Sequence, residues 1–451
     1  MPYEAMLAAG DVEGMRVVLD WVTAFAPLLR ARTALLQPGG AGLFATETVT
    51  ASGLFQLTEY GCDWENRPPG YPRWLEGPGS EGGWVRYDIG GNGFAEAGLM
   101  ALDYFWMTQD VARSAAYIPF ATSYVDYYLS QYKNRSADGR LIIWPAQVLE
   151  SWWCEWEARF SPACSQNDLP NVAALTSLVR GVLALPADSG LLTPAQRAKY
   201  TALAAILPPL PREAGGAMYA VAEVISTDGG HNSEGPTLYG THPFRLETVG
   251  AAVAAPAAVN LSTAQATWRG TPWFNGNTGW SYGIIDAAYL GFSAQAYAMA
   301  LDRARQPPPP GYRFPAFAQH YQDFEPSADH YAVMSTVRPP PPAANRARTQ
   351  RLFPLQPHSH FHPFSQAVQS MLLQSGEDGA AGTIVLLPAW PCAVDVSFKL
   401  WGPLNTSVEV VWAAGALVSL DVVPAERRSA VVFAPCNTTA SAERFPISHA
   451  F

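Results

Sequence analysis

One carboxylate of this sequence lies among several indoles. In the stretch LIIWPAQVLESWW, residues 141–153, Glu150 ends an apolar run and is followed by Trp152 and Trp153. Apolar surroundings disfavour the ionised form of a carboxyl group and therefore raise its pKa. A raised pKa suits a general acid that must protonate a leaving oxygen near neutral pH. The alternative, that Glu150 pairs with an arginine or caps a helix, stays open.

A second group of acids lies in RFPAFAQHYQDFEPSADHY, residues 313–331. It contains Asp323, Glu325, Asp329 and His330, although only 15% of the chain is charged. A carboxylate in such an aromatic segment is suited to activate water as a general base. The alternative is a solvated loop whose acids cap the next helix.

Two Gly-rich segments supply further polar side chains. GGHNSEGPTLYGTHPFRLE contains Asn232, Glu234 and His242, and WFNGNTGWSYG contains Asn277 and Trp280. Glycines let the backbone approach a ligand closely, amides and carboxylates bind hydroxyl groups, and an indole stacks on a flat ligand. The alternatives are a turn with local hydrogen bonds and ordinary packing at a helix end.

The sequence favours neither a metal nor a cofactor. His358, His360 and His362 alternate and would share one face of a strand, but they lie in a Pro-rich segment. The chain has no CxxC, P-loop, GxGxxG, GxSxG or HExxH motif. We therefore expect no metal and no cofactor, and the common nucleotide, serine-hydrolase and zinc-protease mechanisms are disfavoured.

Composition narrows the class of partner. The chain has 451 residues, 49% of them hydrophobic, and a net charge of −10 with no Lys/Arg-rich block. Nucleic acid is disfavoured because phosphate binding needs clustered cations. No apolar run is long enough to span a membrane. The 15 Trp, 19 Tyr and 20 Phe, many beside polar residues, suit a carbohydrate, which presents C–H faces and hydroxyls.

The cysteines and sequons leave the compartment open. Cys154 and Cys164 are close enough in sequence to close a short disulfide loop, or they are two unrelated thiols. The first residues show no signal peptide. Secretion of a full-length form remains compatible with four Asn-x-Ser/Thr sequons, which begin at Asn134, Asn260, Asn405 and Asn437.

Helical patterns dominate the chain to about residue 375, and short β-type runs follow residue 380. We expect helices in 11–36, 93–110, 113–132, 170–186, 193–211, 281–306 and 365–376, and the pattern in 281–306 is the strongest. We expect strands in 383–388, 394–400, 407–412, 416–423 and 429–434. Thr193, Pro194 and Gln196 match the start of a capping box.

This order predicts a mainly α fold. Paired helices fit an (α/α)6 toroid over residues 1–378, the catalytic-type domain, with a disordered Pro-rich insertion at 337–364. A small antiparallel, sandwich-like β-domain would follow at 379–451.

Several motifs together resemble glycoside hydrolase family 95, which contains α-L-fucosidases, and are closer to an uncharacterised bacterial-type branch related to it. The resemblance spans nearly the whole chain. Its most extended part is AVQSMLLQSGEDGAAGTIVLLPAWP, followed by VDVSFKLWGPLNTSVEV. The shorter motifs are MLAAGD (6–11), FATET (44–48), PAQVLESWW (145–153), LPPLP (207–211), RFPAF (313–317) and PSADHY (326–331).

The resemblance implies the same toroid and β-domain, preceded by a β-rich N-terminal region that this chain lacks. It implies hydrolysis of an α-linked fucoside or galactoside with inversion, with Glu150 as general acid and Asp329 as general base. The substrate-binding residues would be Glu47, Trp152, Trp153, Asn232, Glu234, His242, Asn277, Trp280 and His330.

Two other functions stay open. A catalytically inactive relative would keep the cleft and bind carbohydrate without turnover. A phosphorolytic relative would need a cationic pocket beside the cleft, for which Arg245 and Arg313 are candidates.

Overall fold

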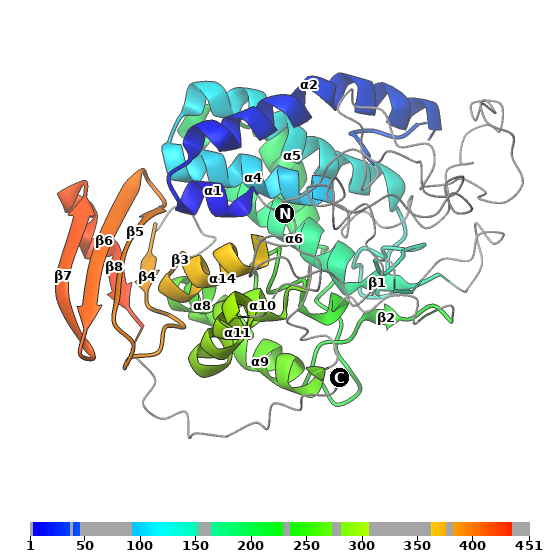
Figure 1. Cartoon of the computed structure of the whole chain (residues 1–451). Helices are drawn as coiled ribbons and strands as arrows, with labels where there is room; N and C mark the ends of the chain where they lie inside the picture. Colours follow the sequence, from blue (N-terminus) through cyan, green and yellow to red (C-terminus); the bar gives the residue numbers. More distant parts are fainter. Residues whose placement is uncertain are drawn as a thin grey trace, which may run out of the picture.

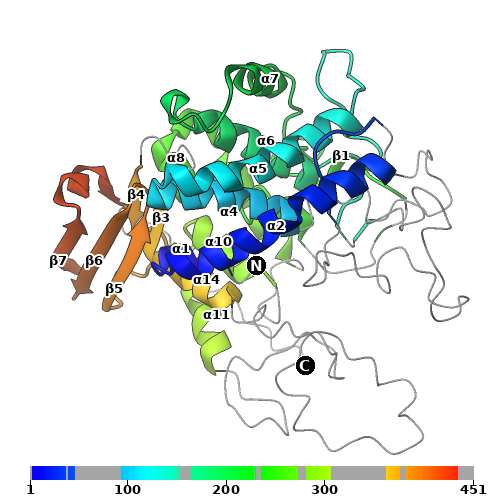
Figure 2. The same ribbon diagram turned by 90° about the horizontal axis from the view of Figure 1, so that it is seen from above.

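A computed structural model describes residues 3–36, 39–45, 93–149, 151–152, 164–227, 229, 235–272, 281–305, 362–375 and 382–434. About half of this structure is helical, and the strands from residue 373 onward gather at one end of it (Figures 1 and 2). The expectation of a mainly helical chain with small sheets in its C-terminal region is therefore confirmed.

The helices are α1 (Glu4–Ala8), α2 (Val12–Leu36), α4 (Gly93–Thr108), α5 (Val111–Gln131), α6 (Leu169–Ala184), α7 (Pro194–Ala204), α8 (Val249–Ala254), α9 (Leu261–Gly270), α10 (Gly283–Tyr289), α11 (Ser293–Arg305) and α14 (His362–Leu372). The strands are β1 (Gln166–Asp168), β2 (Ala222–Val224), β3 (Leu373–Ser375), β4 (Ile384–Leu386), β5 (Val396–Gly402), β6 (Thr406–Ala413), β7 (Ala416–Val423) and β8 (Val431–Phe433).

Side-chain caps define where several helices begin. The predicted capping box is confirmed: Thr193 accepts from the Gln196 amide, and the Gln196 side chain accepts from the backbone N–H of Thr193. Asp168 caps α6, and Asp110 caps α5 two residues after α4 ends. These caps satisfy backbone N–H groups that have no partner inside the helix.

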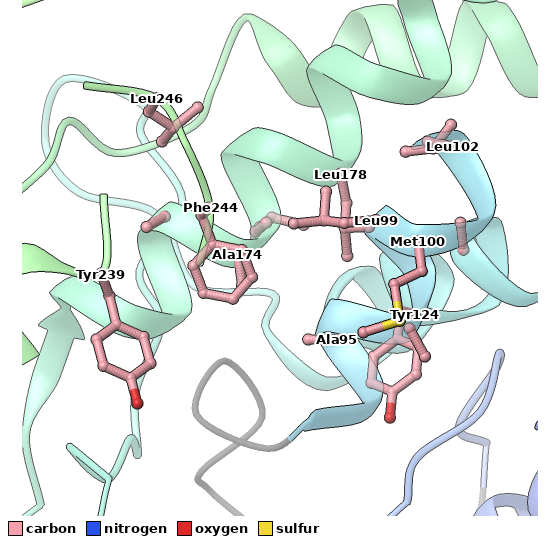
Figure 3. Close-up of a cluster of buried hydrophobic side chains, with 14 of the residues drawn as sticks. Ala95, Leu99, Met100, Leu102, Tyr124, Ala174, Leu178, Tyr239, Phe244 and Leu246 are labelled. Atoms are coloured by element: carbon pink, nitrogen blue, oxygen red, sulfur yellow. The ribbon is translucent and has the colours of Figure 1, made fainter. Parts of the chain in front are cut away.

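The main core lies between α4, α5, α6 and the segment that carries Tyr239, Phe244 and Leu246 (Figure 3). The helices approach closely where glycine removes a side chain. A Cβ at Gly98 of α4 would lie 2.9 Å from Leu178 Cδ2, and one at Gly181 of α6 would lie 2.6 Å from Leu102 Cδ1. Small residues thus set the distance between α4 and α6.

The strongest predicted helix, residues 281–306, is two helices. Gly291 adopts a left-handed φ of 80° between α10 and α11, a conformation that glycine adopts without steric cost. The amide of Phe292 donates to the Ala287 carbonyl at 2.9 Å, which closes α10. The apolar periodicity continues across this break and hides it from pattern analysis.

The predicted helix 365–376 also differs from the structure. Helix α14 begins earlier, at His362, and its last predicted residues form β3, which pairs antiparallel with β4. His362 is therefore helical rather than part of an extended alternation of histidines. Residues 362–364, which the sequence assigned to the Pro-rich insertion, therefore belong to α14. The rest of the predicted insertion, residues 337–361, lies outside the described residues.

All five predicted β-type runs contain strands, β4 to β8, but their pairing is not purely antiparallel. Strands β5, β6 and β7 form an antiparallel sheet, whereas β4 pairs parallel with β8 and antiparallel with β3. This second sheet is mixed because β8 runs parallel to β4, whereas β3, which directly follows α14, runs antiparallel to it. A sandwich of antiparallel strands alone was therefore too simple an expectation.

The covalent features bear on the sequence expectations. Cys164 and Cys392 are each disulfide-bonded. Cys154 lies outside the described residues, so its pairing with Cys164 stays a prediction. The sequon residues Asn134, Asn260 and Asn405 are exposed.

In the part of the chain described above, no helix combines the length and apolar character that a bilayer span requires.

Asp286 of α10 is a buried acid that limits stability. Its side chain is 5% exposed, and no described residue hydrogen-bonds its Oδ1. Burial raises the pKa of Asp286 well above its usual value. An acid whose folded-state pKa exceeds its unfolded-state pKa retains a proton that the unfolded chain releases, so stability falls as pH rises between the two values.

We predict that Asp286→Asn removes this dependence. Between about pH 4 and the folded-state pKa, wild type should lose about 1.4 kcal/mol per pH unit relative to the variant. Urea unfolding at several pH values in this range measures the difference. Parallel stability curves for the two proteins would contradict the prediction.

Candidate functional site

The residues that flank Glu150 form a tight, well-bonded turn. Val148 and Trp152 exchange backbone hydrogen bonds of 3.1 Å, and the Ser151 amide also donates to the Val148 carbonyl at 3.1 Å. Leu149 has a left-handed φ of 48°, which is uncommon for such a residue. The buried Gln147 amide donates to the Leu149 carbonyl at 2.7 Å. The turn is therefore held from inside the protein.

The segment before this turn is anchored by Asn167 rather than by a regular sheet. The backbone N–H of Ile143 donates to Asn167 Oδ1 at 2.8 Å, and the backbone N–H of Asn167 donates to the Ile143 carbonyl at 2.9 Å. Ala146 exchanges two backbone hydrogen bonds of 3.0 Å with Ser165. These bonds fix the course of residues 143–148 next to β1.

Strand β2 extends the same scaffold. It pairs antiparallel with β1, and the Ser226 amide just beyond it donates to Ser165 Oγ at 2.9 Å. Three residues later, Gly229 forms a β-bridge with Trp152. A Cβ at Gly229 would lie 2.1 Å from Trp152 Cδ1, so only glycine fits against this indole.

The bridge joins two of the segments that the sequence singled out. Trp152 belongs to the segment with Glu150, and Gly229 opens the Gly-rich segment that continues to Asn232 and Glu234. No pattern in the sequence predicts that these segments lie side by side. The remaining predicted site residues lie outside the described residues: Glu47, Glu150, Trp153, Asn232, Glu234, Asn277, Trp280, Asp329 and His330.

His242 lies in a different environment from Trp152. Its ring is 2% exposed and packs edge-on against Tyr282, with centroids 4.6 Å apart, and parallel to Tyr289 at 6.3 Å. Its Nε2 is 3.9 Å from a carboxylate oxygen of Glu4. His242 is thus buried among aromatic rings, three residues before Arg245.

Charges near His242 are compensated or neutralised. Arg245 Nη2 donates to both carboxylate oxygens of Asp103 at 2.8 Å, so this guanidinium already has an anionic partner. Glu96 is 5% exposed. Its burial, together with the charge of Glu4, raises the pKa of Glu96 to about 7. Arg245 is therefore a weak candidate for holding the phosphate of a phosphorolytic reaction.

Metal ligands are not assembled in the described ranges: no group of three or more His, Cys, Asp or Glu side chains there is placed to hold an ion.

Comparison with protein-family models and with curated proteins found no match to this chain. The geometry of the site therefore carries the functional argument.

Sequence reasoning missed the residues that support the turn. Asn167, Asp168 and Ser165 lie in SQNDLPN, where Asp168 before Leu169 and Pro170 is a recognisable helix start. That signal identifies the cap of α6. It does not reveal that Asn167 reaches a segment more than twenty residues away.

We predict that Gly229→Ala destabilises the protein by about 1–3 kcal/mol, because the methyl group displaces the Trp152 indole or the backbone opposite it. Urea unfolding monitored by circular dichroism measures the loss. Gly240→Ala is the matched control, since its Cβ would meet the flexible end of Leu210 at 3.2 Å and Glu247 Cγ at an ordinary 3.8 Å. Equal effects of the two substitutions would contradict a special contact at Gly229.

Proposed function

We propose that this protein is a glycoside hydrolase that cleaves an α-linked sugar of the fucoside or galactoside type with inversion of configuration. Glu150 is the general acid and Asp329 the general base. The helical part is the body of an (α/α)6 toroid whose loops form the sugar-binding cleft.

The observation that supports this proposal most directly is the contact between Trp152 and Gly229. It joins a segment that carries one acid among indoles to a segment rich in glycine, amide and carboxylate groups. An aromatic face beside hydroxyl-binding groups is the chemistry that a sugar ring requires. The hydrogen bonds of Val148 with Ser151 and Trp152 also fix residues on both sides of the acid in the sequence, and general acid catalysis needs a positioned acid.

In the proposed reaction the Glu150 carboxylic acid donates its proton to the glycosidic oxygen as the bond to the anomeric carbon breaks. The Asp329 carboxylate removes a proton from a water molecule that attacks the opposite face of the same carbon. The products are the free alcohol and a sugar of inverted anomeric configuration. The glutamate ends ionised and the aspartate protonated, and exchange with solvent restores both.

Substrates with different leaving groups distinguish the roles of the two carboxyl groups. On methyl or aryl α-L-fucosides and α-D-galactosides, we expect Glu150→Gln to lower kcat/KM by about 10²–10⁴. On the corresponding glycosyl fluorides it should lower kcat/KM far less, because fluoride departs without protonation. Asp329→Asn should lower both rates, since every substrate needs the activated water. The anomer formed first, followed by proton NMR, should be β.

Glu213→Gln and Asp188→Asn, at exposed positions, are the matched controls and should behave as wild type. Loss of Glu150 that affects fluoride and glycoside equally would contradict the acid role. A wild-type chain that binds these sugars but turns none of them over would overturn hydrolysis and favour the inactive carbohydrate-binding protein.

A further inference from the structure

A pocket lies away from the turn at Trp152. It has a volume of about 140 Å³ and is bounded by α1, α4, α6, α14, β3 and β5. Strand β5 is at one end of the helical part and β1, which supports the turn, is at the other (Figures 1 and 2). The pocket therefore lies away from Trp152, although Glu4 and Tyr289 in its wall contact His242.

The charges around this pocket argue against an anionic ligand. Among the described residues that line it, the charged side chains are Glu4, Asp103 and Arg245. Two carboxyl groups thus face one guanidinium, and that guanidinium is already hydrogen-bonded to both oxygens of Asp103. A phosphate or carboxylate entering here would meet net negative charge.

Two nearly buried side chains in the pocket wall have polar atoms without partners. Gln366 is 6% exposed and Trp106 is 8% exposed. Within the described structure, neither Gln366 Oε1 nor Trp106 Nε1 makes a hydrogen bond. Leaving such a group unsatisfied costs about 1–3 kcal/mol. One atom accepts and the other donates, so a ligand that satisfies both must carry donors and acceptors together.

Of the other glutamines in the pocket wall, Gln369 also has an Oε1 without a hydrogen bond within the described structure, whereas Gln374 has partners for both of its side-chain polar atoms. Its Nε2 donates to the carbonyls of Ala288 and Ser370, and its Oε1 accepts from the Gly250 amide. Gln374 thus serves the fold, whereas the Gln366 amide makes only a long contact of 3.5 Å with the Tyr289 hydroxyl. The difference points to a role of Gln366 outside the fold.

Much of the remaining wall is apolar or aromatic, beside polar side chains such as Ser177, Gln369 and Ser370. Trp106 and Trp401 line the pocket together with aliphatic side chains such as Leu7 and Leu102. Flat apolar faces beside a few hydrogen-bonding groups match the C–H faces and hydroxyls of a sugar ring. The volume of about 140 Å³ corresponds to about five water molecules at the share of volume that water has in the liquid, which is the scale of a single small ring.

We propose that this pocket binds a neutral polyhydroxylated small molecule, a single sugar residue, through Gln366, Trp106 and the indole of Trp401. The site goes beyond the proposed hydrolysis and does not depend on it.

The test is calorimetric titration of the full chain with free monosaccharides, which have no glycosidic bond to cleave. The probes are fucose, galactose and glucose, each to about 10 mM, with glucuronate and glucose 6-phosphate as charged counterparts. We expect one or more neutral sugars to bind. Trp106→Phe and Gln366→Met should each weaken that binding about tenfold, the effect of losing one hydrogen bond.

Trp268→Phe is the matched control, because its indole donates to the Gly283 carbonyl outside the pocket. It should leave the affinity unchanged. Unfolding measurements separate binding from folding: Gln366→Met should keep the stability of the unliganded protein, whereas Gln374→Met should lower it.

Three results would overturn the proposal: no neutral sugar binds, binding survives both Trp106→Phe and Gln366→Met, or the charged sugars bind more tightly. Hydrolysis by wild type is measured separately. Its absence would contradict the proposed function and would leave this test intact.

Discussion

Asn167 is the side chain on which the arrangement of the candidate catalytic segment depends. Its Oδ1 and backbone N–H bind Ile143 from two directions, and its Nδ2 donates to Glu223 Oε2 of β2. Asn167 thus connects its own strand, β1, to β2 and to the segment around Ile143, which belongs to no strand. Its left-handed φ of 47° is a conformation that asparagine tolerates better than most residues. A residue without this side-chain amide would leave the Ile143 amide unsatisfied.

The helices give this connection a rigid base. Asp168 follows Asn167 directly and caps α6, and its carboxylate also accepts from the Asn171 side chain. Asn171 in turn accepts from the Tyr128 hydroxyl of α5 at 2.8 Å. The buried polar chain therefore runs from the β1 segment through α6 to α5. Because α6 packs tightly on α4 at Gly98 and Gly181, a shift of the turn would have to move several helices.

The sequence predicted features whose causes are local. The capping box at Thr193 and the strands β4 to β8 follow from neighbouring residues and periodicity. The break at Gly291 and the strand β3 were missed, because their causes are a left-handed glycine and a partner strand beyond the helix. The same reason limits the site. The composition around Glu150 indicated chemistry, but the contact of Trp152 with Gly229 is set by long-range pairing that no local pattern encodes.

The buried acids connect stability to the proposed chemistry. Burial raises the pKa values of Asp168 and Glu96 to about 7, in Asp168 despite hydrogen bonds from Asn171 that favour the ionised form. Both folded-state values exceed the unfolded-state values of about 4. Between about pH 4 and 7 the folded protein therefore holds protons that the unfolded chain releases, and stability falls as pH rises. A general acid must also be protonated to act, so its contribution to the rate declines in the same direction. Folding and the general acid step thus both favour a pH at which carboxyl groups remain protonated, whereas the proposed base Asp329 must stay ionised, so the rate should be greatest between the two requirements.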